Sequence, residues 1–204
     1  MSIVLLRHGE TALNAARVLQ PPDTPLSPRG LAQARSAARV LAERRIGAIV
    51  SSDLPRAWQT ASALAEATGL DIVSEPLLQE RNFGDLRGRP YDTLGFDPLA
   101  MDGAPPGGES AHDFRTRVAR AFAHLVASRA VLDGDLVAVS HGLVIHAMLA
   151  AHATLGESAV LPARIGNASI SVLAARAPHV VALLDDVRHL QGIVADDPES
   201  LSGG

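Results

Sequence analysis

Residues 3–14 carry the sequence IVLLRHGETALN, an apolar run that ends abruptly in charged and polar residues. The run from Ile3 to Leu6 is apolar on both faces of an extended chain, which is typical of a strand buried in a parallel sheet. Arg7, His8 and Gly9 follow it directly, and a glycine here lets the backbone turn sharply and approach a ligand closely. Because ligands of open α/β sheets bind beyond the carboxyl ends of the strands, these residues are the first candidates for a functional site.

Strand and helix patterns alternate along the rest of the chain. Apolar runs predict further strands at residues 48–51, 70–73, 136–139, 169–173 and 180–184. Capping residues and apolar periodicity predict helices at residues 28–42, 55–67 and 142–154, and one more after Ser110. The alternation predicts an α/β fold, a three-layer sandwich with a mostly parallel central sheet flanked by helices.

The helix at residues 28–42 has the clearest start signal. Ser27 supplies a side-chain cap, and proline at position 28 suits the first helical residue. Helical spacing predicts that the stripe facing the core consists of Leu31, Ala34, Ala38, Leu41 and Ala42.

The length of 204 residues suits one well-filled core. We predict a single domain over residues 1–194. Residues 82–108 contain glycines, prolines and aspartates without sustained periodicity and are too long for a simple connector, so they predict a cap or loop insertion. Residues 195–204 are expected to form a flexible tail.

Composition excludes several classes of function. The formal net charge of −4 offers no basic surface, so we expect no nucleic-acid partner. The chain has no cysteine, which excludes disulfides, thiolate catalysis and cysteine metal sites. The longest apolar stretch, residues 143–155, is interrupted by His146 and His152 and is too short for a membrane helix. We expect a cytoplasmic protein with no membrane partner.

Polar residues follow three of the predicted strands at matching places. Arg7 and His8 follow the first strand, Arg56 lies shortly after the second, and His141 and Gly142 follow a later one. If these strands are parallel neighbours, two histidines and two arginines converge on one edge of the sheet. A neutral imidazole can attack phosphorus, guanidinium groups bind phosphate oxygens in pairs, and N–H groups at the helix start after Gly142 would add donors. This set favours phosphoryl transfer.

Five segments occur in the order and approximate spacing of the histidine phosphatase superfamily, in its phosphoglycerate mutase-like branch: LLRHGETALN, SSDLPRAWQTA, QERNFGDLRG, PPGGES and VSHG. The chain resembles this family over nearly its whole length. The resemblance implies that His8 is the nucleophile that becomes phosphohistidine, and that Arg7, Arg56 and His141 bind the transferred phosphoryl group. It also implies that no metal and no other cofactor is needed.

The resemblance further implies that Glu80 is the general acid and base and that Asn14 belongs to the phosphate pocket. As acid, Glu80 would protonate the leaving oxygen, and as base it would activate the water that hydrolyses phosphohistidine, which demands a raised pKa. The neighbouring Arg81 should oppose this shift unless it points away. Asp85 is the nearby rival for the role.

Two arginines depart from the family pattern. Relatives often carry an aromatic and then an acidic residue where Leu86 and Arg87 stand, so Arg87 and Arg89 predict a more cationic leaving-group side and a substrate with extra negative charge. Two solvated arginines on an exposed loop are the alternative. His189 falls where relatives often have a histidine, but the sequence assigns it no mechanistic role.

The same phosphohistidine chemistry supports hydrolysis or phosphoryl shuttling. The chain lacks the lysine and the longer segment that the larger mutases carry after the catalytic glutamate, which favours a metal-independent phosphomonoesterase acting on a small phosphorylated substrate. The alternatives are a phosphoglycerate mutase and a non-catalytic phospho-ligand binding protein. A cofactor-binding oxidoreductase is disfavoured because no GxGxxG follows the first strand. The sequence leaves the physiological substrate and the oligomeric state open, with a homodimer as one alternative.

Overall fold

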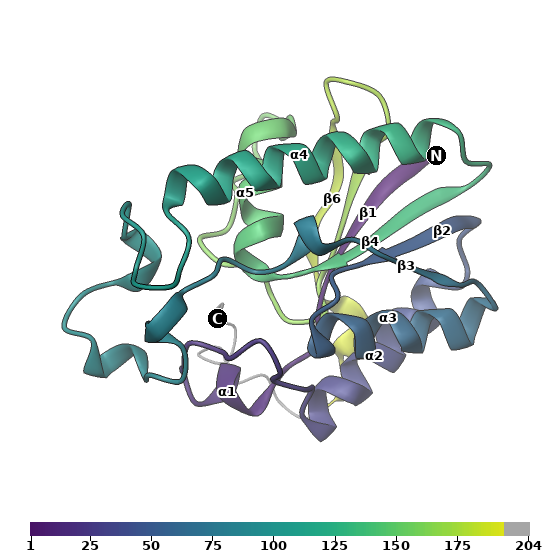
Figure 1. The fold of residues 1–204 in the computed structure, drawn as a ribbon. Helices are drawn as coiled ribbons and strands as arrows, with labels where there is room; N and C mark the ends of the chain where they lie inside the picture. Colours follow the sequence, from purple (N-terminus) through teal and green to yellow (C-terminus); the bar gives the residue numbers. More distant parts are fainter. Residues whose placement is uncertain (194–204) are drawn as a thin grey trace.

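The computed structural model describes residues 1–193, which form a central sheet with helices on both faces (Figure 1). The strands are β1 (Ser2–Arg7), β2 (Ile46–Ser51), β3 (Ile72–Ser74), β4 (Asp135–Ser140), β5 (Ile170–Ala174) and β6 (Val181–Asp186). The α-helices are α1 (Ala12–Ala15), α2 (Pro28–Leu41), α3 (Pro55–Thr68), α4 (Ala111–Ala130) and α5 (Gly142–His152). The short 3-10 helices are η1 (Pro76–Leu78), η2 (Gly84–Leu86), η3 (Tyr91–Thr93), η4 (Pro98–Ala100) and η5 (Arg188–Leu190). The predicted α/β sandwich is confirmed.

The six strands lie in the order β3-β2-β4-β1-β5-β6. The pairs β2–β3, β2–β4 and β1–β4 are parallel, whereas β5 pairs antiparallel with both β1 and β6. The sheet is therefore mostly parallel, as predicted, with antiparallel pairing at one edge. β1 and β4 are neighbours in register, so Arg7 at the end of one strand lies beside Ser140 at the end of the other.

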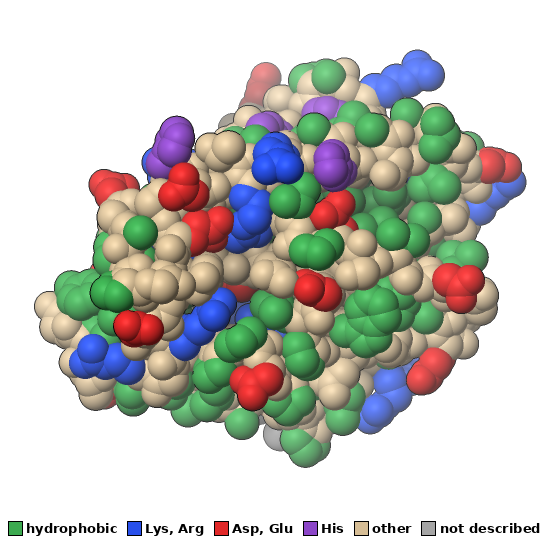
Figure 2. Space-filling model, viewed as in Figure 1, with side chains coloured by type: hydrophobic (Ala, Val, Ile, Leu, Met, Phe, Trp, Pro, Cys, Tyr) green, Lys and Arg blue, Asp and Glu red, His purple; other side chains and the backbone are tan. Residues whose placement is uncertain are grey.

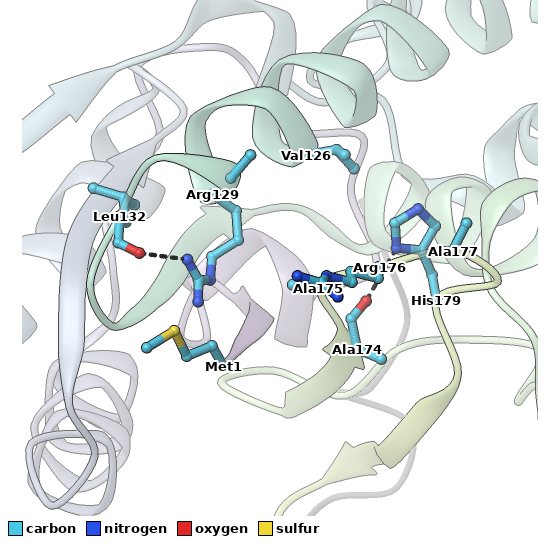
Figure 3. Close-up of a pocket in the computed structure, with 10 residues that line it drawn as sticks. Met1, Val126, Arg129, Leu132, Ala174, Ala175, Arg176, Ala177 and His179 are labelled. Carbon is cyan, nitrogen blue, oxygen red and sulfur yellow. Dashed lines mark hydrogen bonds between the residues drawn. The ribbon is translucent and has the colours of Figure 1, made fainter.

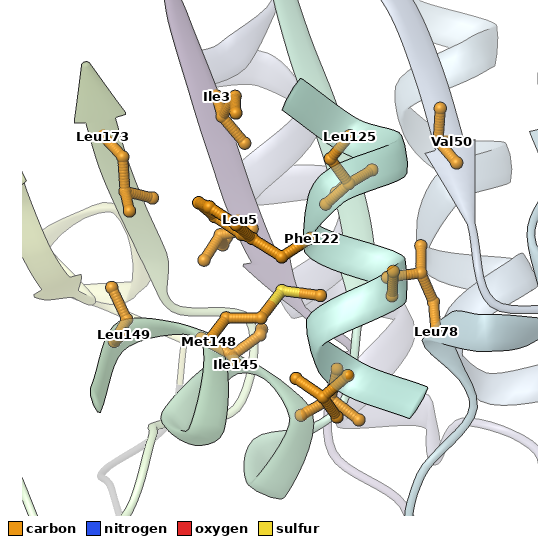
Figure 4. Close-up of a cluster of buried hydrophobic side chains, with 14 of the residues drawn as sticks. Ile3, Leu5, Val50, Leu78, Phe122, Leu125, Ile145, Met148, Leu149 and Leu173 are labelled. Atoms are coloured by element: carbon orange, nitrogen blue, oxygen red, sulfur yellow. The ribbon is translucent and has the colours of Figure 1, made fainter. Parts of the chain in front are cut away.

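Alternate residues of β1 contribute to two separate cores, one on each face of the sheet. Ile3 and Leu5 belong to a cluster with side chains of α4 and α5, including Phe122 (Figure 4). Val4 and Leu6 point to the other face and pack among residues of α2 and α3. This burial on both faces is the arrangement that a continuous apolar run predicts.

α2 begins as predicted but turns a different face to the core. The Gly30 N–H donates to the Ser27 Oγ at 3.0 Å. The predicted stripe was wrong at two positions, because Leu31 is 37% exposed and Ala42 is also exposed. The buried face is shifted by one residue because Gly30 contacts the backbone of Glu10, and this contact sets the rotation of the helix. The buried residues are Gly30, Gln33, Ala34, Ala37, Ala38 and Leu41.

Residues 82–108 form a long excursion between η1 and α4 that contains η2, η3 and η4. The Leu19 N–H donates to the Arg89 carbonyl group at 3.1 Å, and the Tyr91 N–H donates to the Arg17 carbonyl group at 3.0 Å. These bonds tie the excursion to the segment that follows α1, on the side where the parallel strands end (Figure 1).

Acidic and basic side chains are mixed over the face of the molecule shown in Figure 2. Among residues 1–193, no helix combines the length and the apolar character needed to cross a membrane. The extent of a single domain over residues 1–194 stays a prediction. The expected flexible tail, residues 195–204, lies outside the described residues.

Candidate active site

The central strands of the sheet end at one level and bring the predicted residues together. The His8 N–H donates to the Ser140 carbonyl group at 3.0 Å, and the Ser52 N–H donates to the Val139 carbonyl group at 3.0 Å. The rings of His8 and His141 consequently lie 5.1 Å apart, measured between centroids. The convergence expected at the carboxyl edge of the sheet is therefore present in the structure.

His8 is fully buried and held in one tautomer. Its Nδ1 lies 2.7 Å from the Gly9 carbonyl oxygen, and because a carbonyl group can only accept, Nδ1 carries the proton. Its Nε2 is buried and has no hydrogen-bond partner within residues 1–193. Burial, together with the charges of Arg7 and Arg56, holds the pKa of His8 well below its ordinary value. The ring is therefore neutral at pH 7, with the lone pair on Nε2.

Gly9 is required by packing against backbone rather than by the approach of a ligand. A Cβ atom on Gly9 would lie 2.4 Å from the Gly30 carbonyl oxygen, and one on Gly30 would lie 1.9 Å from the Glu10 carbonyl oxygen. The chain after β1 therefore touches the start of α2 backbone to backbone. Glu10 supports the same junction, since its carboxylate accepts from the Ser27 hydroxyl at 3.0 Å and from Arg29 at 3.1 Å.

Two guanidinium groups, those of Arg7 and Arg56, are buried in the site, with exposures of 0% and 2%. Arg7 donates to the Ile165 carbonyl group, and Arg56 donates to the Pro21 carbonyl group at 3.4 Å. Burial lowers the pKa of each guanidinium to about 10, and the charge of Glu80 opposes the shift. Both groups stay protonated at pH 7, so the site carries two positive charges that an anion would offset.

His141 is the residue immediately before α5. Its Nε2 lies 2.9 Å from the Ser52 hydroxyl oxygen, and its buried Nδ1 has no partner among the described residues. Burial and the charge of Arg56 hold the pKa of His141 well below its ordinary value. A Cβ atom on Gly142 would lie 3.4 Å from the Arg7 guanidinium, so Gly142 packs next to that group. Ser52 is one of the polar residues expected at the end of the second strand, but the sequence assigned it no role.

The carboxyl group of Glu80 is buried beside these residues. Burial raises its pKa, and the opposing influences are the backbone N–H groups of Arg81 at 3.0 Å and Leu143 at 3.2 Å and the two buried arginines. The guanidinium of Arg81 points away and donates to the Met101 carbonyl group at 2.6 Å. A raised pKa keeps the Glu80 carboxyl group protonated at higher pH, which a general acid requires.

The start of α5 donates a hydrogen bond to the carboxyl group of Glu80. The N–H groups after Gly142 were expected to donate to phosphate, but the Leu143 N–H donates to Glu80 instead. Asp85, the alternative acid, is exposed in η2. Glu80 is therefore the carboxyl group that shares the buried site with the histidines.

Asn14 lies in α1, and its side chain is buried. Its Oδ1 accepts from the Thr11 N–H at 3.3 Å and from the Asn167 side-chain amide at 3.2 Å. Its Nδ2 is buried and has no partner within the described residues. Asn167 also donates to the His8 carbonyl group at 3.3 Å, a contact that no sequence motif indicated. The side-chain NH₂ group of Asn14 thus has both of its N–H donors free for a ligand, and its phosphate role stays a prediction.

The two arginines of the excursion lie in different surroundings. Arg87 is half-buried, burial lowers its pKa, and its positive charge also lowers the pKa of Arg56. Arg89 is exposed, and it is its backbone that holds the segment to Leu19. Arg87 is therefore the better placed of the pair to meet a substrate.

Sequence reasoning missed Tyr91 and Arg164. Burial raises the pKa of the Tyr91 phenol, and the charges of Glu80, Arg7 and Arg164 act on it. These electrostatic interactions indicate that Tyr91 lies near Glu80, Arg7 and Arg164. No motif marked either position, because Tyr91 lies in the aperiodic excursion and Arg164 in a loop before β5.

No other histidine of residues 1–193 is hydrogen-bonded to His8, Glu80 or His141. The His152 ring stacks on Phe122 with centroids 4.8 Å apart, His146 is a partly buried residue of α5, and the His189 Nε2 lies 3.0 Å from the Ala168 carbonyl oxygen. Within residues 1–193, no group of three or more histidine, aspartate or glutamate side chains is arranged to hold a metal ion.

The family model described as the histidine phosphatase superfamily (branch 1) matches residues 3–184. The chain is 34% identical, over a 217-residue alignment, to the probable phosphoglycerate mutase GpmB of Proteus mirabilis (strain HI4320), which covers 97% of this chain and 98% of that protein. A solved mycobacterial glucosyl-3-phosphoglycerate phosphatase has a TM-score of 0.74 and 33% identity, covering 91% of this chain and 99% of its own. The alpha-ribazole phosphatase from Shigella flexneri has a TM-score of 0.78 and 25% identity, and the match covers 91% of this chain and 96% of that protein's chain.

The matched range contains all of the predicted site residues, and phosphatases are among the proteins of similar structure. The expected enzyme class, a phosphatase, and the expected fold are therefore confirmed. On the evidence of its sequence match, its sheet and its site, the chain belongs to the histidine phosphatase superfamily, branch 1.

Proposed function

We propose that the protein is a phosphomonoesterase that acts through a phosphohistidine intermediate on a small phosphorylated metabolite. One observation carries the proposal: the buried His8 ring is tied through Nδ1 to the Gly9 carbonyl group, while Nε2 has no partner within the described residues. A neutral, oriented imidazole is what nucleophilic attack on phosphorus requires. The buried Arg7 and Arg56 supply positive charge where the phosphoryl oxygens would lie.

In the first step, the Nε2 lone pair of His8 attacks phosphorus, and the bond between phosphorus and the ester oxygen breaks. Protonated Glu80 donates its proton to the leaving oxygen, and the burial that raises its pKa favours this protonated form. The imidazole becomes positively charged in phosphohistidine, and its Nδ1–H continues to donate to the Gly9 carbonyl group. The two arginines offset the negative charge on the phosphoryl oxygens throughout.

In the second step, a water molecule attacks phosphorus and the bond between phosphorus and Nε2 breaks. The carboxylate of Glu80 accepts a proton from the water, so the residue is ready to act as an acid again. His8 recovers its lone pair, and inorganic phosphate leaves the site. The same two residues therefore serve both halves of the reaction, and no other proton carrier is needed.

We further propose that the substrate carries a second anionic group on the leaving-group side. The positive charge of Arg87 acts on Arg56, and that of Arg164 acts on Arg7 and on the Tyr91 phenol, so both arginines lie near the reacting residues. A phosphorylated hydroxy acid would meet this requirement. One structural relative at 33% identity is named as a phosphatase of glucosyl-3-phosphoglycerate, a substrate of that chemistry.

A phosphoglycerate mutase is the second candidate. The observation that favours it is that relatives matching nearly the whole chain, such as the protein of Proteus mirabilis, are named as probable phosphoglycerate mutases. Both candidates use His8 in the same way, and they differ in whether water or a second substrate hydroxyl accepts the phosphoryl group from His8.

The test is phosphate release from a panel of phosphomonoesters, with a chelator present throughout. The panel includes glycerol phosphate and 3-phosphoglycerate, which differ in one carboxylate, and 2-phosphoglycerate formation is followed in the same samples. We expect release by the wild type, none by His8→Ala, and no loss on chelation. Interconversion of phosphoglycerates without net release would establish the mutase instead. Absence of both activities would indicate a phospho-ligand binding protein.

Three further expectations stay proposals. We propose that the reaction needs no metal, which the chelator arm tests directly. A cytoplasmic location and the absence of nucleic-acid and membrane partners stay predictions from composition. The oligomeric state, with a homodimer as one alternative, requires a measurement of mass in solution.

A further inference from the structure

A second cavity lies at the opposite end of β1 from the candidate active site. Its volume is about 790 Å³, within the range of sites that take small molecules. Met1, the end of α4 and the turn between β5 and β6 form its walls (Figure 3). Because a strand rises about 3.3 Å per residue, the six residues of β1 separate this cavity from the catalytic edge by about 20 Å.

Arg129 is the deepest polar residue of this cavity. It is 4% exposed, and its guanidinium donates one bond to the Leu132 carbonyl group at 2.8 Å, which closes the end of α4. Its Nε is buried without a hydrogen-bond partner among the described residues. In Figure 3 the guanidinium extends from the helix into the space above Met1. One carbonyl bond therefore leaves part of this buried cation without a hydrogen-bond partner.

The positive charge of Arg129 has no acidic counterpart. Within residues 1–193 it takes part in none of the ion pairs, and no aspartate or glutamate lines the cavity. A second arginine, Arg176, lines the same cavity from the turn between β5 and β6. Buried arginines are seldom left without a paired charge, because taking the cation out of water is costly. Arg129 is buried whereas Arg176 is exposed, so it is the unpaired charge of Arg129 that indicates a place for a negatively charged group from outside.

The rest of the lining is apolar. Alanines, a valine and a leucine make up most of the wall between the two arginines, and His179 closes one side with its Nδ1 3.0 Å from the Ala174 carbonyl oxygen. A bare inorganic ion would leave this apolar wall in contact with water. A ligand that joins one anionic group to a small apolar body would cover both parts of the cavity.

We propose that this cavity binds a small organic anion, a carboxylate or phosphate carried on an apolar body, with Arg129 and Arg176 as its charge partners. The site is separate from the catalytic edge and does not depend on the reaction proposed above. Nδ1 of His179 already faces a backbone carbonyl group, so this ring contributes a wall and not a charge partner.

The experiment is a titration of the full chain with phenylphosphonate, followed through backbone amide signals in NMR spectra. This probe carries a phosphorus–carbon bond, so phosphohistidine chemistry cannot hydrolyse it. We expect saturable shifts of Leu132 and Ala175 at the cavity, with a dissociation constant distinct from that of shifts near His8. Arg129→Met and Arg176→Glu should each weaken binding at the cavity by about tenfold or more, the effect of losing one charged partner.

Matched controls separate the proposal from trivial outcomes. Arg120→Glu changes an exposed arginine of α4 outside the cavity and should leave the titration unchanged. Arg176→Glu keeps the bond from Arg129 to Leu132, so loss of binding there cannot come from unravelling of the helix end. No saturable shift at the cavity, or binding that survives both arginine substitutions, would overturn the proposal. Equal binding of uncharged benzyl alcohol would also overturn it, since the cavity would then recognise only apolar groups.

Discussion

Acidification should destabilise the folded protein through two buried histidines, His8 and His141. Burial and neighbouring arginines hold the pKa of both well below 6.5. In the unfolded chain both rings bind protons near pH 6.5, whereas in the folded protein they stay neutral. The unfolded state then binds more protons, so the free energy of unfolding is fully retained above about pH 6.5 and falls as the pH drops toward the folded-state pKa values.

The size of the effect follows from the number of protons. Each histidine that stays neutral in the folded state contributes a slope of about 1.4 kcal/mol per pH unit, and the pair contributes about 2.7 kcal/mol per pH unit. Glu80 acts in the opposite sense, because its raised pKa lets the folded state hold a proton above the usual carboxyl range. The difference between wild type and His8→Asn isolates one histidine and should be about 1.4 kcal/mol per pH unit.

The assay is urea unfolding followed by circular dichroism at several pH values between about 7.5 and 5.5, on both sides of the ordinary histidine pKa. Asn14→Ala is the matched control, because it alters a buried polar residue of the same site and removes no titrating group. Its slope should equal that of the wild type. If the free energy of unfolding of the wild type did not change with pH, or if its slope were the same in His8→Asn, the prediction would be wrong. The buried rings would then bind protons in the folded protein as readily as in the unfolded chain.

Three further predictions concern single residues. Glu80→Gln should lower kcat for alkyl phosphates by about 10²–10⁴. It should also remove the loss of kcat/KM that occurs as the pH rises through the raised pKa of Glu80. If pH–rate profiles of the variant keep this loss, the titrating group is another residue. Gly30→Ala should lower the free energy of unfolding, measured in urea, by at least about 3 kcal/mol, because the new Cβ atom would meet the Glu10 carbonyl oxygen. The control Gly103→Ala, with open space around it, should change this free energy by no more than about 0.5 kcal/mol. Similar losses in the two variants would refute the contact. Arg87→Glu should raise KM for 3-phosphoglycerate more than for glycerol phosphate, and equal increases would remove the proposed second anion contact.

Much of the fold follows from local patterns in the sequence. The run from Ile3 to Leu6 predicted a strand buried on both faces, and its alternate residues do contribute to two cores. Ser27 predicted the start of α2 because capping depends on residues three positions apart. The rotation of α2 was mispredicted, since a distant backbone contact between Gly30 and Glu10 decides which side is buried.

The candidate site divides in the same way. His8, His141 and the buried arginines were found because each follows a strand, and strand ends in a parallel sheet converge by geometry. The contacts of Ser52 with His141 and of Asn167 with His8 were missed because they join segments far apart in the chain. Local sequence carries no information about such pairs unless a motif marks them.

The sequence by itself determined the family, the order of the six strands and the four longer α-helices along the chain, and the residues that carry the proposed chemistry. Only the tertiary structure decided the strand order in the sheet, the tautomer of His8 and the protonation tendency of Glu80. It also revealed the cavity around Arg129, whose lining residues come from three separate parts of the chain. The physical reason is that periodicity and capping act over a few residues, whereas burial, desolvation and charge pairing depend on which distant groups the completed fold places together.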